Sequence, residues 1–276
     1  TRRYYRVRDS GTSWVLALYP GPFVPEELTY NTVHALLVSY GLPVPATEAV
    51  DGERGIVLQE DLGDLTLQAV LEDAGDGRRE ELFREAVDEM AQLQQRAAQG
   101  PQKAECFRIA FDIEKLSWEL HYFLKHFVAG HRRCDLTVED RATLSEAFHQ
   151  LSHEIASWPR VLCHRDYHSR NLMLHRERLH WIDFQDARMG PATYDLASLL
   201  RDAYVDVPEA LQEELKERFR QKATPDEPRE PVPLRPHGDR RGCRARAPHN
   251  GTYGRPRFQR GPQFDGDTLG RWWIAP

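Results

Sequence analysis

The stretch VLCHRDYHSRNLMLHRERLHWIDFQDARMGPATYDLASLL, residues 161–200, decides the fold and the chemistry that we expect of this chain. Within 18 residues it holds Asp166, Asn171 and Asp183. Short apolar runs predict small strands around these residues, at 161–163, 172–174 and 179–182. Asp166 and Asn171 are five residues apart, so one loop could present both side chains to one pocket. A hairpin over residues 172–182 would bring Asp183 to the same pocket.

The three side chains suit the transfer of a phosphoryl group. That reaction needs a carboxylate to orient and deprotonate the acceptor hydroxyl, and oxygen ligands that hold Mg²⁺ against nucleotide phosphates. Asp166 fits the first role. Asn171 and Asp183 fit the second, because Mg²⁺ prefers oxygen ligands and takes few protein side chains. Any one of them alone could be a turn residue bonding its own backbone, but their combined spacing favours a site.

Composition sets limits on the class of protein. The chain has 276 residues, 40% of them hydrophobic and 29% charged, which is enough for one large or two small domains. A formal net charge of -6 predicts no general attraction to nucleic acid or to anionic membranes. The irregular spacing of four cysteines predicts neither a disulfide framework nor a structural zinc site. Without a long apolar run or a signal pattern, we expect a soluble, cytoplasmic protein.

Two parts of the chain differ in pattern. Residues 1–61 predict a β-β-α-β-β order, with the helix starting near Pro25 and strands at 3–8, 14–19, 46–50 and 55–60. Residues 62–222 predict a mainly helical part, with amphipathic helices at 78–98, 111–129, 136–157 and 194–204. The helical spacing of Trp118, Tyr122 and Phe123 is typical of core residues, an interpretation that we prefer to a sugar-stacking platform.

The composition changes again at residues 223–276. This segment holds half of the chain's 18 prolines and no lysine, and its apolar residues follow no period. We expect a disordered tail or the translation of DNA out of frame. An arginine-rich nucleic-acid-binding tail is the less favoured alternative.

The pattern H-x-D-x-x-x-x-N, followed by a hairpin and Ile182-Asp183-Phe184, resembles the protein-kinase-like fold in its aminoglycoside phosphotransferase and choline kinase branch. Through residues 190–202 the sequence is most similar to bacterial kinases that phosphorylate the anomeric hydroxyl of N-acetylmuramate and N-acetylglucosamine. The resemblance covers residues 2–222. It implies a two-lobed α+β fold, with a small antiparallel β lobe and a mainly helical lobe. It also implies an enzyme that uses ATP and Mg²⁺ to phosphorylate a small-molecule sugar.

The resemblance also implies roles for particular residues. Asp166 would be the catalytic base, and Asn171 and Asp183 would be the magnesium ligands. His164 and Asp195 would support the loop that carries them. Nucleotide contacts would come from the strand-to-helix hinge and the first hairpin, at Gln59, Glu60, Leu62, Arg3 and Arg6. Candidate sugar contacts are Gln185 and Tyr194.

The first hairpin departs from the family pattern. It has no glycine-rich loop, and residues 14–19 contain no lysine where kinases place the one that pairs with nucleotide phosphates. Arg3 or Arg6 could supply that charge.

Two other functions stay open at the level of sequence. An aminoglycoside or choline-type kinase would share the site but differ in its acceptor. A catalytically silent nucleotide-binding protein would fit the missing lysine. A zinc site at His164, His168 and His175 is disfavoured, because their spacing does not place them on one helix face.

Overall fold

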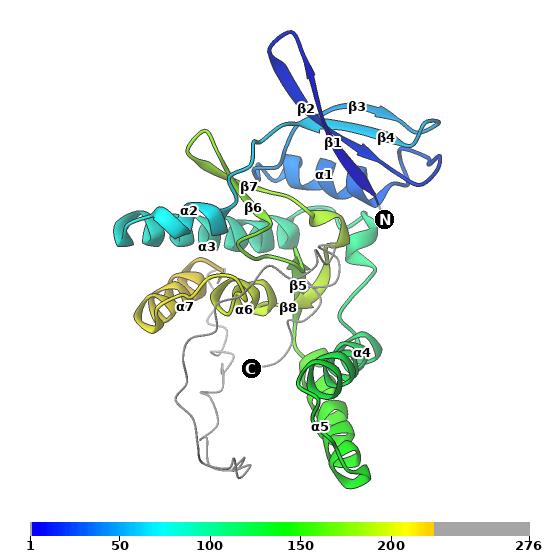
Figure 1. The fold of residues 1–276 in the computed structure, drawn as a ribbon, viewed down its shortest axis with the longest axis vertical. Coiled ribbons are helices and arrows are strands. Elements are labelled where there is room, and N and C mark those ends of the chain that lie inside the picture. The colour runs from blue at the N-terminus through cyan, green and yellow to red at the C-terminus, as the bar shows by residue number, and fades with distance from the viewer. Residues whose placement is uncertain (1, 224–276) are drawn as a thin grey trace.

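The computed structural model describes residues 2–223, which form two lobes joined by the chain that follows residue 60 (Figure 1). The first lobe is an antiparallel sheet in the order β1-β2-β4-β3, with one helix packed against it. Its elements are β1 (Arg3–Asp9), β2 (Thr12–Leu18), α1 (Thr29–Ser39), β3 (Thr47–Asp51) and β4 (Ile56–Glu60). The predicted β-β-α-β-β order is confirmed.

Local sequence explains the first hairpin of this sheet. Ser10 and Gly11 both have positive φ, 46° and 85°, which is the geometry of a two-residue turn between twisted strands. The helix that follows starts later than the sequence indicates. Residues 25–27 form a turn, and α1 begins at Thr29, because Leu28 has extended backbone angles.

The second lobe is mainly helical and carries two small two-stranded sheets. Its helices are α2 (Leu67–Asp73), α3 (Asp76–Gln99), α4 (Ile113–Phe123), the π-helical continuation η2 (Leu124–His131), α5 (Val138–Ala156), α6 (Tyr194–Leu200) and α7 (Glu209–Ala223), with short 3-10 turns η1 (Glu105–Phe107) and η3 (Phe184–Asp186). The sheets pair β5 (Arg160–Cys163) with β8 (Arg188–Pro191), and β6 (Leu172–His175) with β7 (Arg178–Trp181). The predicted α+β fold class is confirmed, although α2, β8 and α7 were not predicted.

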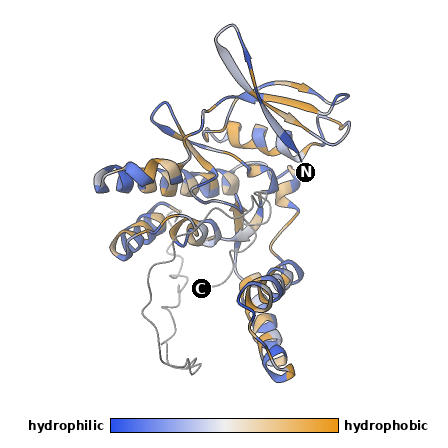
Figure 2. Cartoon of the chain, in the orientation of Figure 1, coloured by the Kyte–Doolittle hydropathy of each residue, from blue (hydrophilic) through white to orange (hydrophobic). Residues whose placement is uncertain are grey.

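Helix α3 is the centre of the helical lobe. Phe83, Ala86 and Met90 recur at spacings of three and four positions and are fully buried, so one face of the helix lies in the core. That face packs against α7, β5 and β7. Figure 2 shows hydrophilic and hydrophobic residues alternating along α3, α5 and α7.

Helices α4 and α5 pack mainly against each other and project from the lobe (Figure 1). Trp118 on α4 is 45% exposed, so the prediction that it lies in the core is wrong. The ammonium of Lys115 lies 4.2 Å from the centroid of its ring instead.

No helix in residues 2–223 is long and apolar enough to span a membrane. Cys106, Cys134 and Cys163 are free thiols, and Cys243 lies outside the described residues. The atypical segment expected from residue 223 onward also lies outside them, apart from Ala223 at the end of α7.

Gly190→Ala is expected to destabilise the helical lobe by about 1–3 kcal/mol. A Cβ at residue 190 would lie 2.7 Å from a ring carbon of Phe111 and 3.1 Å from the Cys163 sulfur, in a place with no spare volume. Urea denaturation followed by circular dichroism measures the change. Gly77→Ala is the matched control, because a Cβ there meets nothing within 4 Å. Equal unfolding midpoints for the two variants would contradict the packing described for Gly190.

Candidate active site

The loop of residues 164–171, which we call the catalytic loop after the role that the sequence predicts for Asp166, is held by one buried carboxylate. Asp195, on the first turn of α6, is fully buried and accepts hydrogen bonds from the backbone N–H groups of His164, at 2.7 Å, and Arg165, at 2.9 Å. Burial raises the pKa of Asp195 to about 7, and the two N–H donors act against that rise by stabilising the carboxylate. The pair of bonds fixes the direction in which the chain leaves β5.

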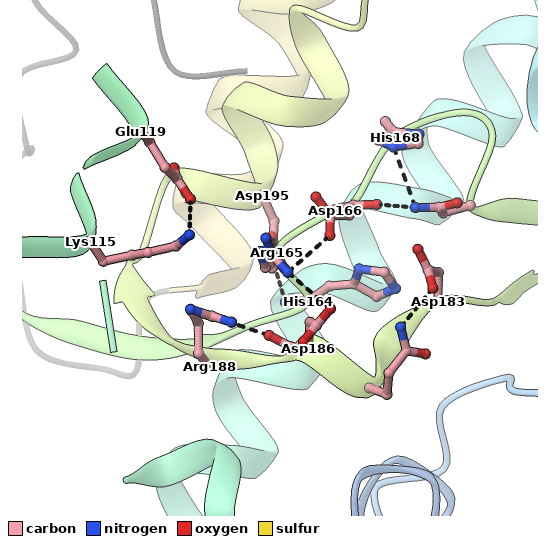
Figure 3. A network of polar contacts seen from close by, with 12 residues as sticks. Lys115, Glu119, His164, Arg165, Asp166, His168, Asp183, Asp186, Arg188 and Asp195 are labelled. Carbon is pink, nitrogen blue, oxygen red and sulfur yellow. Dashed lines mark hydrogen bonds and ion pairs between the residues drawn. The ribbon is translucent and has the colours of Figure 1, made fainter. Parts of the chain in front are cut away.

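The backbone then turns sharply before Asp166. Arg165 has φ of 87°, a left-handed conformation that non-glycine residues rarely adopt. The Arg165 guanidinium lies 3.7 Å from the Asp166 carboxylate and 3.0 Å from that of Asp186 (Figure 3). The turn therefore presents Asp166 next to a cation and beside a second acid.

The environment of Asp166 makes its proton affinity higher than that of an ordinary aspartate. Burial raises its pKa to about 6, the Arg165 cation lowers it, and the neighbouring Asp183 and Asp186 carboxylates raise it. A carboxylate of this kind is still ionised at neutral pH, and it is a stronger proton acceptor than an exposed one.

Asn171 closes the catalytic loop on itself. Its side-chain amide donates to the Asp166 backbone oxygen at 2.8 Å, and its backbone oxygen accepts from the Ile182 N–H at 3.0 Å. The first bond fixes the side chain, and the second ties the loop to the strand that leads to Asp183. The Asn171 amide oxygen is the atom left to act as a metal ligand.

Asp183 starts the turn η3 with φ of 62°, again left-handed. One of its carboxylate oxygens accepts from the Gln185 amide at 2.7 Å and lies 3.5 Å from the Arg2 guanidinium. His164 joins the two ends of the site, because its ring lies 3.1 Å from the Ile182 backbone oxygen. Burial lowers the pKa of His164 to about 4, so this imidazole is neutral and structural.

Asp166, Asn171 and Asp183 line one cleft of about 940 Å³ between the lobes. Its upper wall comes from the sheet lobe and includes Val15 on β2, and its lower wall includes Met173 and Ile182. The cleft thus has apolar side chains from both lobes as well as oxygen ligands, a combination that suits a flat base that carries phosphates.

The donor set fits Mg²⁺. One carboxylate and one amide oxygen, from Asp183 and Asn171, face the same cleft and leave the remaining positions to phosphate and water. Across the described part of the chain, His, Cys, Asp and Glu form no cluster of three or more that could hold a metal, including His164, His168 and His175.

The other predicted site residues divide into two groups. Gln59, Glu60, Leu62 and Gln185 line the cleft. Arg3, Arg6 and Tyr194 do not. Arg6 instead binds the carboxylates of Asp61 and Asp64, at 2.7 and 2.8 Å, and Tyr194 stacks on Phe111 with ring centroids 4.1 Å apart.

Sequence reasoning missed several residues of the cleft. Arg2 reaches it from the sheet lobe, and Arg170, His168 and Tyr204 line it from the helical lobe. The Arg170 guanidinium lies 3.7 Å from the centroid of the Tyr204 ring. Arg170 and His168 carried a signal because both lie between Asp166 and Asn171, and Arg2 carried one because it lies next to Arg3 at the start of the basic first hairpin.

A buried acid on α3 supports the strand that leads to Asp183. Glu89 accepts a hydrogen bond from the Trp181 indole at 2.8 Å, and the Trp181 ring packs edge-on against Tyr167 of the catalytic loop. The Trp181 backbone N–H donates to Pro43 of the sheet lobe at 2.7 Å. Trp181, two residues before Asp183, is thus fixed from three sides.

The sheet lobe, the helical lobe and the cleft between them define the class of protein by its fold, which is two-lobed and protein-kinase-like. The model of the Phosphotransferase enzyme family matches residues 1–231, and the chain belongs to that family. Its fold matches ADP-bound aminoglycoside phosphotransferase APH(2'')-Ib with a TM-score of 0.54 at 16% identity, over 81% of this chain and 78% of that one.

Two curated relatives are more similar in sequence. The N-acetylmuramate/N-acetylglucosamine kinase of Neisseria meningitidis serogroup B is 34% identical over 223 residues, which are 80% of this chain and 64% of that protein. The enzyme of the same name from Pseudomonas aeruginosa is also 34% identical, over 81% of this chain and 63% of its own. The chain therefore spans a little under two thirds of the length of these relatives.

Glu89→Gln is expected to change how stability depends on pH. Burial raises the pKa of Glu89 to about 8, against an unfolded value near 4.5, so the folded state binds one proton more between these limits. The contribution of Glu89 to the free energy of unfolding is therefore fully present below about pH 4.5, and it is lost as the pH rises through about 8. The Gln side chain retains an oxygen that accepts the Trp181 hydrogen bond. Because Gln does not titrate, the variant does not lose stability in this pH range.

Urea unfolding of both proteins at pH 5, 6.5 and 8 measures the effect. The stability of Glu89→Gln relative to wild type should increase with pH. Glu81→Gln, at an exposed position of the same helix, is the control. A stability difference that does not vary with pH would contradict the neutral, buried state of Glu89.

Proposed function

We propose that this protein is an ATP-dependent phosphotransferase that phosphorylates the anomeric hydroxyl of N-acetylmuramate or N-acetylglucosamine. The observation that carries the proposal is that Asp166, Asn171 and Asp183 line one cleft, in a chain 34% identical to two kinases named for these sugars. The ADP-bound state of a structural neighbour supports the use of ATP. A product of this kind would enter the recycling of cell-wall sugars in the cytoplasm.

In the proposed mechanism, the adenine lies between the apolar walls at Val15 and Met173, beside the hinge residues Gln59, Glu60 and Leu62. Bound Mg²⁺ would neutralise charge on the phosphates, and Asn171 and Asp183 are the residues that would hold it. Asp166 accepts the proton of the sugar hydroxyl as the hydroxyl oxygen bonds to the γ-phosphorus. The bond from that phosphorus to the β-phosphate bridging oxygen breaks, and ADP leaves.

The remaining residues position these groups. Asp195 and His164 hold the catalytic loop by backbone hydrogen bonds, so Asp166 needs no reorganisation to meet the hydroxyl. The Arg165 cation lowers the pKa of Asp166 against the rise caused by burial, which favours the ionised carboxylate. Gln185, next to Asp183 on the cleft wall, is the proposed sugar contact.

Asp166→Asn is expected to lower kcat by about 10²- to 10⁴-fold, because the amide cannot accept the hydroxyl proton. A coupled ADP-release assay with N-acetylglucosamine measures kcat, and titration calorimetry measures the affinity for Mg·ATP, which should change little. Asp206→Asn is the matched control, since Asp206 is exposed and outside the cleft. Wild-type turnover in Asp166→Asn would refute the proposed base.

The acceptor position has a separate test. The enzyme should release ADP with N-acetylglucosamine as the acceptor. It should not do so with the methyl glycoside of this sugar, because only the anomeric hydroxyl is blocked in the glycoside. Equal ADP release from both sugars would move the reaction to another hydroxyl. Phosphoryl transfer to kanamycin alone would favour an aminoglycoside kinase. Thermal stabilisation by Mg·ATP, without turnover on any acceptor, would favour a catalytically silent nucleotide-binding protein.

A further inference from the structure

Among the lysines and arginines of residues 2–223, arginine alone supplies positive charge to the cleft. The lysines of residues 2–223 are Lys103, Lys115, Lys125, Lys216 and Lys222, and none of them lines the cleft. Three arginines do, at positions 2, 165 and 170. A nucleotide triphosphate bound there would therefore meet guanidinium groups rather than an ammonium.

Two of these arginines already have partners on the helical lobe. Arg165 lies 3.0 Å from the Asp186 carboxylate. Arg170 donates to the Gln68 side chain at 2.8 Å and stacks on Tyr204. Both belong to the catalytic loop, so neither reaches the cleft from the sheet that covers it.

Arg2 is the cation of the sheet lobe that reaches across the cleft. Its guanidinium lies 3.5 Å from an Asp183 oxygen and donates to the Tyr19 hydroxyl at 3.4 Å. The same group lies 5.7 Å from the ring centroids of Tyr4 and Tyr19. The side chain is 19% exposed, so these contacts hold the charge against the upper wall and point it at the expected magnesium ligand.

The other arginines of the first lobe form ion pairs outside the cleft or do not line the cleft. Arg6 bridges Asp61 and Asp64, and Arg54 pairs with Asp51 at 2.7 Å. Arg3 and Arg8 are exposed residues of β1 that do not line the cleft. Within residues 2–60, Arg2 alone combines a place in the cleft with a contact to Asp183.

We propose that Arg2 binds the phosphates of the nucleotide, in the place where other kinases use a lysine. The inference rests on the proposed function, because it concerns the nucleotide of that reaction. Without nucleotide, Arg2 pairs with Asp183 across the cleft. With Mg²⁺ and a nucleotide bound, Asp183 would be one of the residues that hold the ion, and the Arg2 guanidinium would donate its parallel N–H groups to the phosphate oxygens.

Titration calorimetry of the full chain with ATP and with adenosine, at saturating Mg²⁺, tests this role. Arg2→Gln is expected to weaken ATP binding by about 10- to 100-fold, the usual effect of losing a charged hydrogen bond. Adenosine affinity should stay unchanged, since adenosine has no phosphate. Arg2→Lys should recover part of the ATP affinity, because it restores the charge without the planar fork.

Arg8→Gln is the matched control on the same strand and should bind both ligands as wild type does. Equal losses of ATP and adenosine affinity in Arg2→Gln would make Arg2 a structural tie and overturn the inference. So would a loss of ATP affinity in Arg3→Gln but not in Arg2→Gln. If the wild-type chain binds adenosine and ATP equally, the phosphate site itself is refuted, whereas failure to bind either ligand refutes the proposed function.

Discussion

Two hydrogen bonds from consecutive backbone N–H groups to the buried Asp195 carboxylate are the constraint on which the site depends. They fix the chain where it leaves β5 and support the left-handed turn at Arg165. Hydrogen bonds to a charged acceptor each contribute about 1.5–3 kcal/mol, enough to maintain a strained backbone conformation. The direction of Asp166 follows from that turn, and Asn171 bonds in turn to the Asp166 backbone.

Much of the fold and the centre of the site could be predicted from sequence because they are encoded locally. The turn at Ser10 and Gly11 and the apolar periods of the helices are short-range patterns. Asp166, Asn171 and Asp183 lie within one loop and one hairpin, so their shared cleft needs few long-range contacts. Their roles as base and metal ligands stay proposals that the geometry supports.

What the sequence did not predict depends on contacts between distant residues. Arg6 has the right charge, but Asp61 and Asp64, more than 50 residues away, bind it outside the cleft. Tyr194 stacks on Phe111 because α6 lies beside the segment that precedes α4. Arg2 enters the cleft only because the sheet covers the catalytic loop. A local pattern cannot tell these arginines apart, since each lies in the same basic, aromatic run.

The most direct test of the account is where a divalent ion lies when a nucleotide is bound. A crystal structure of the chain with Mn²⁺ and a non-hydrolysable ATP analogue would locate the metal by its anomalous scattering. The account predicts one peak between the Asn171 amide oxygen, the Asp183 carboxylate and the terminal phosphates, with the Asp166 carboxylate facing the γ-phosphate. Manganese bound away from Asp183, or a γ-phosphate remote from Asp166, would contradict it.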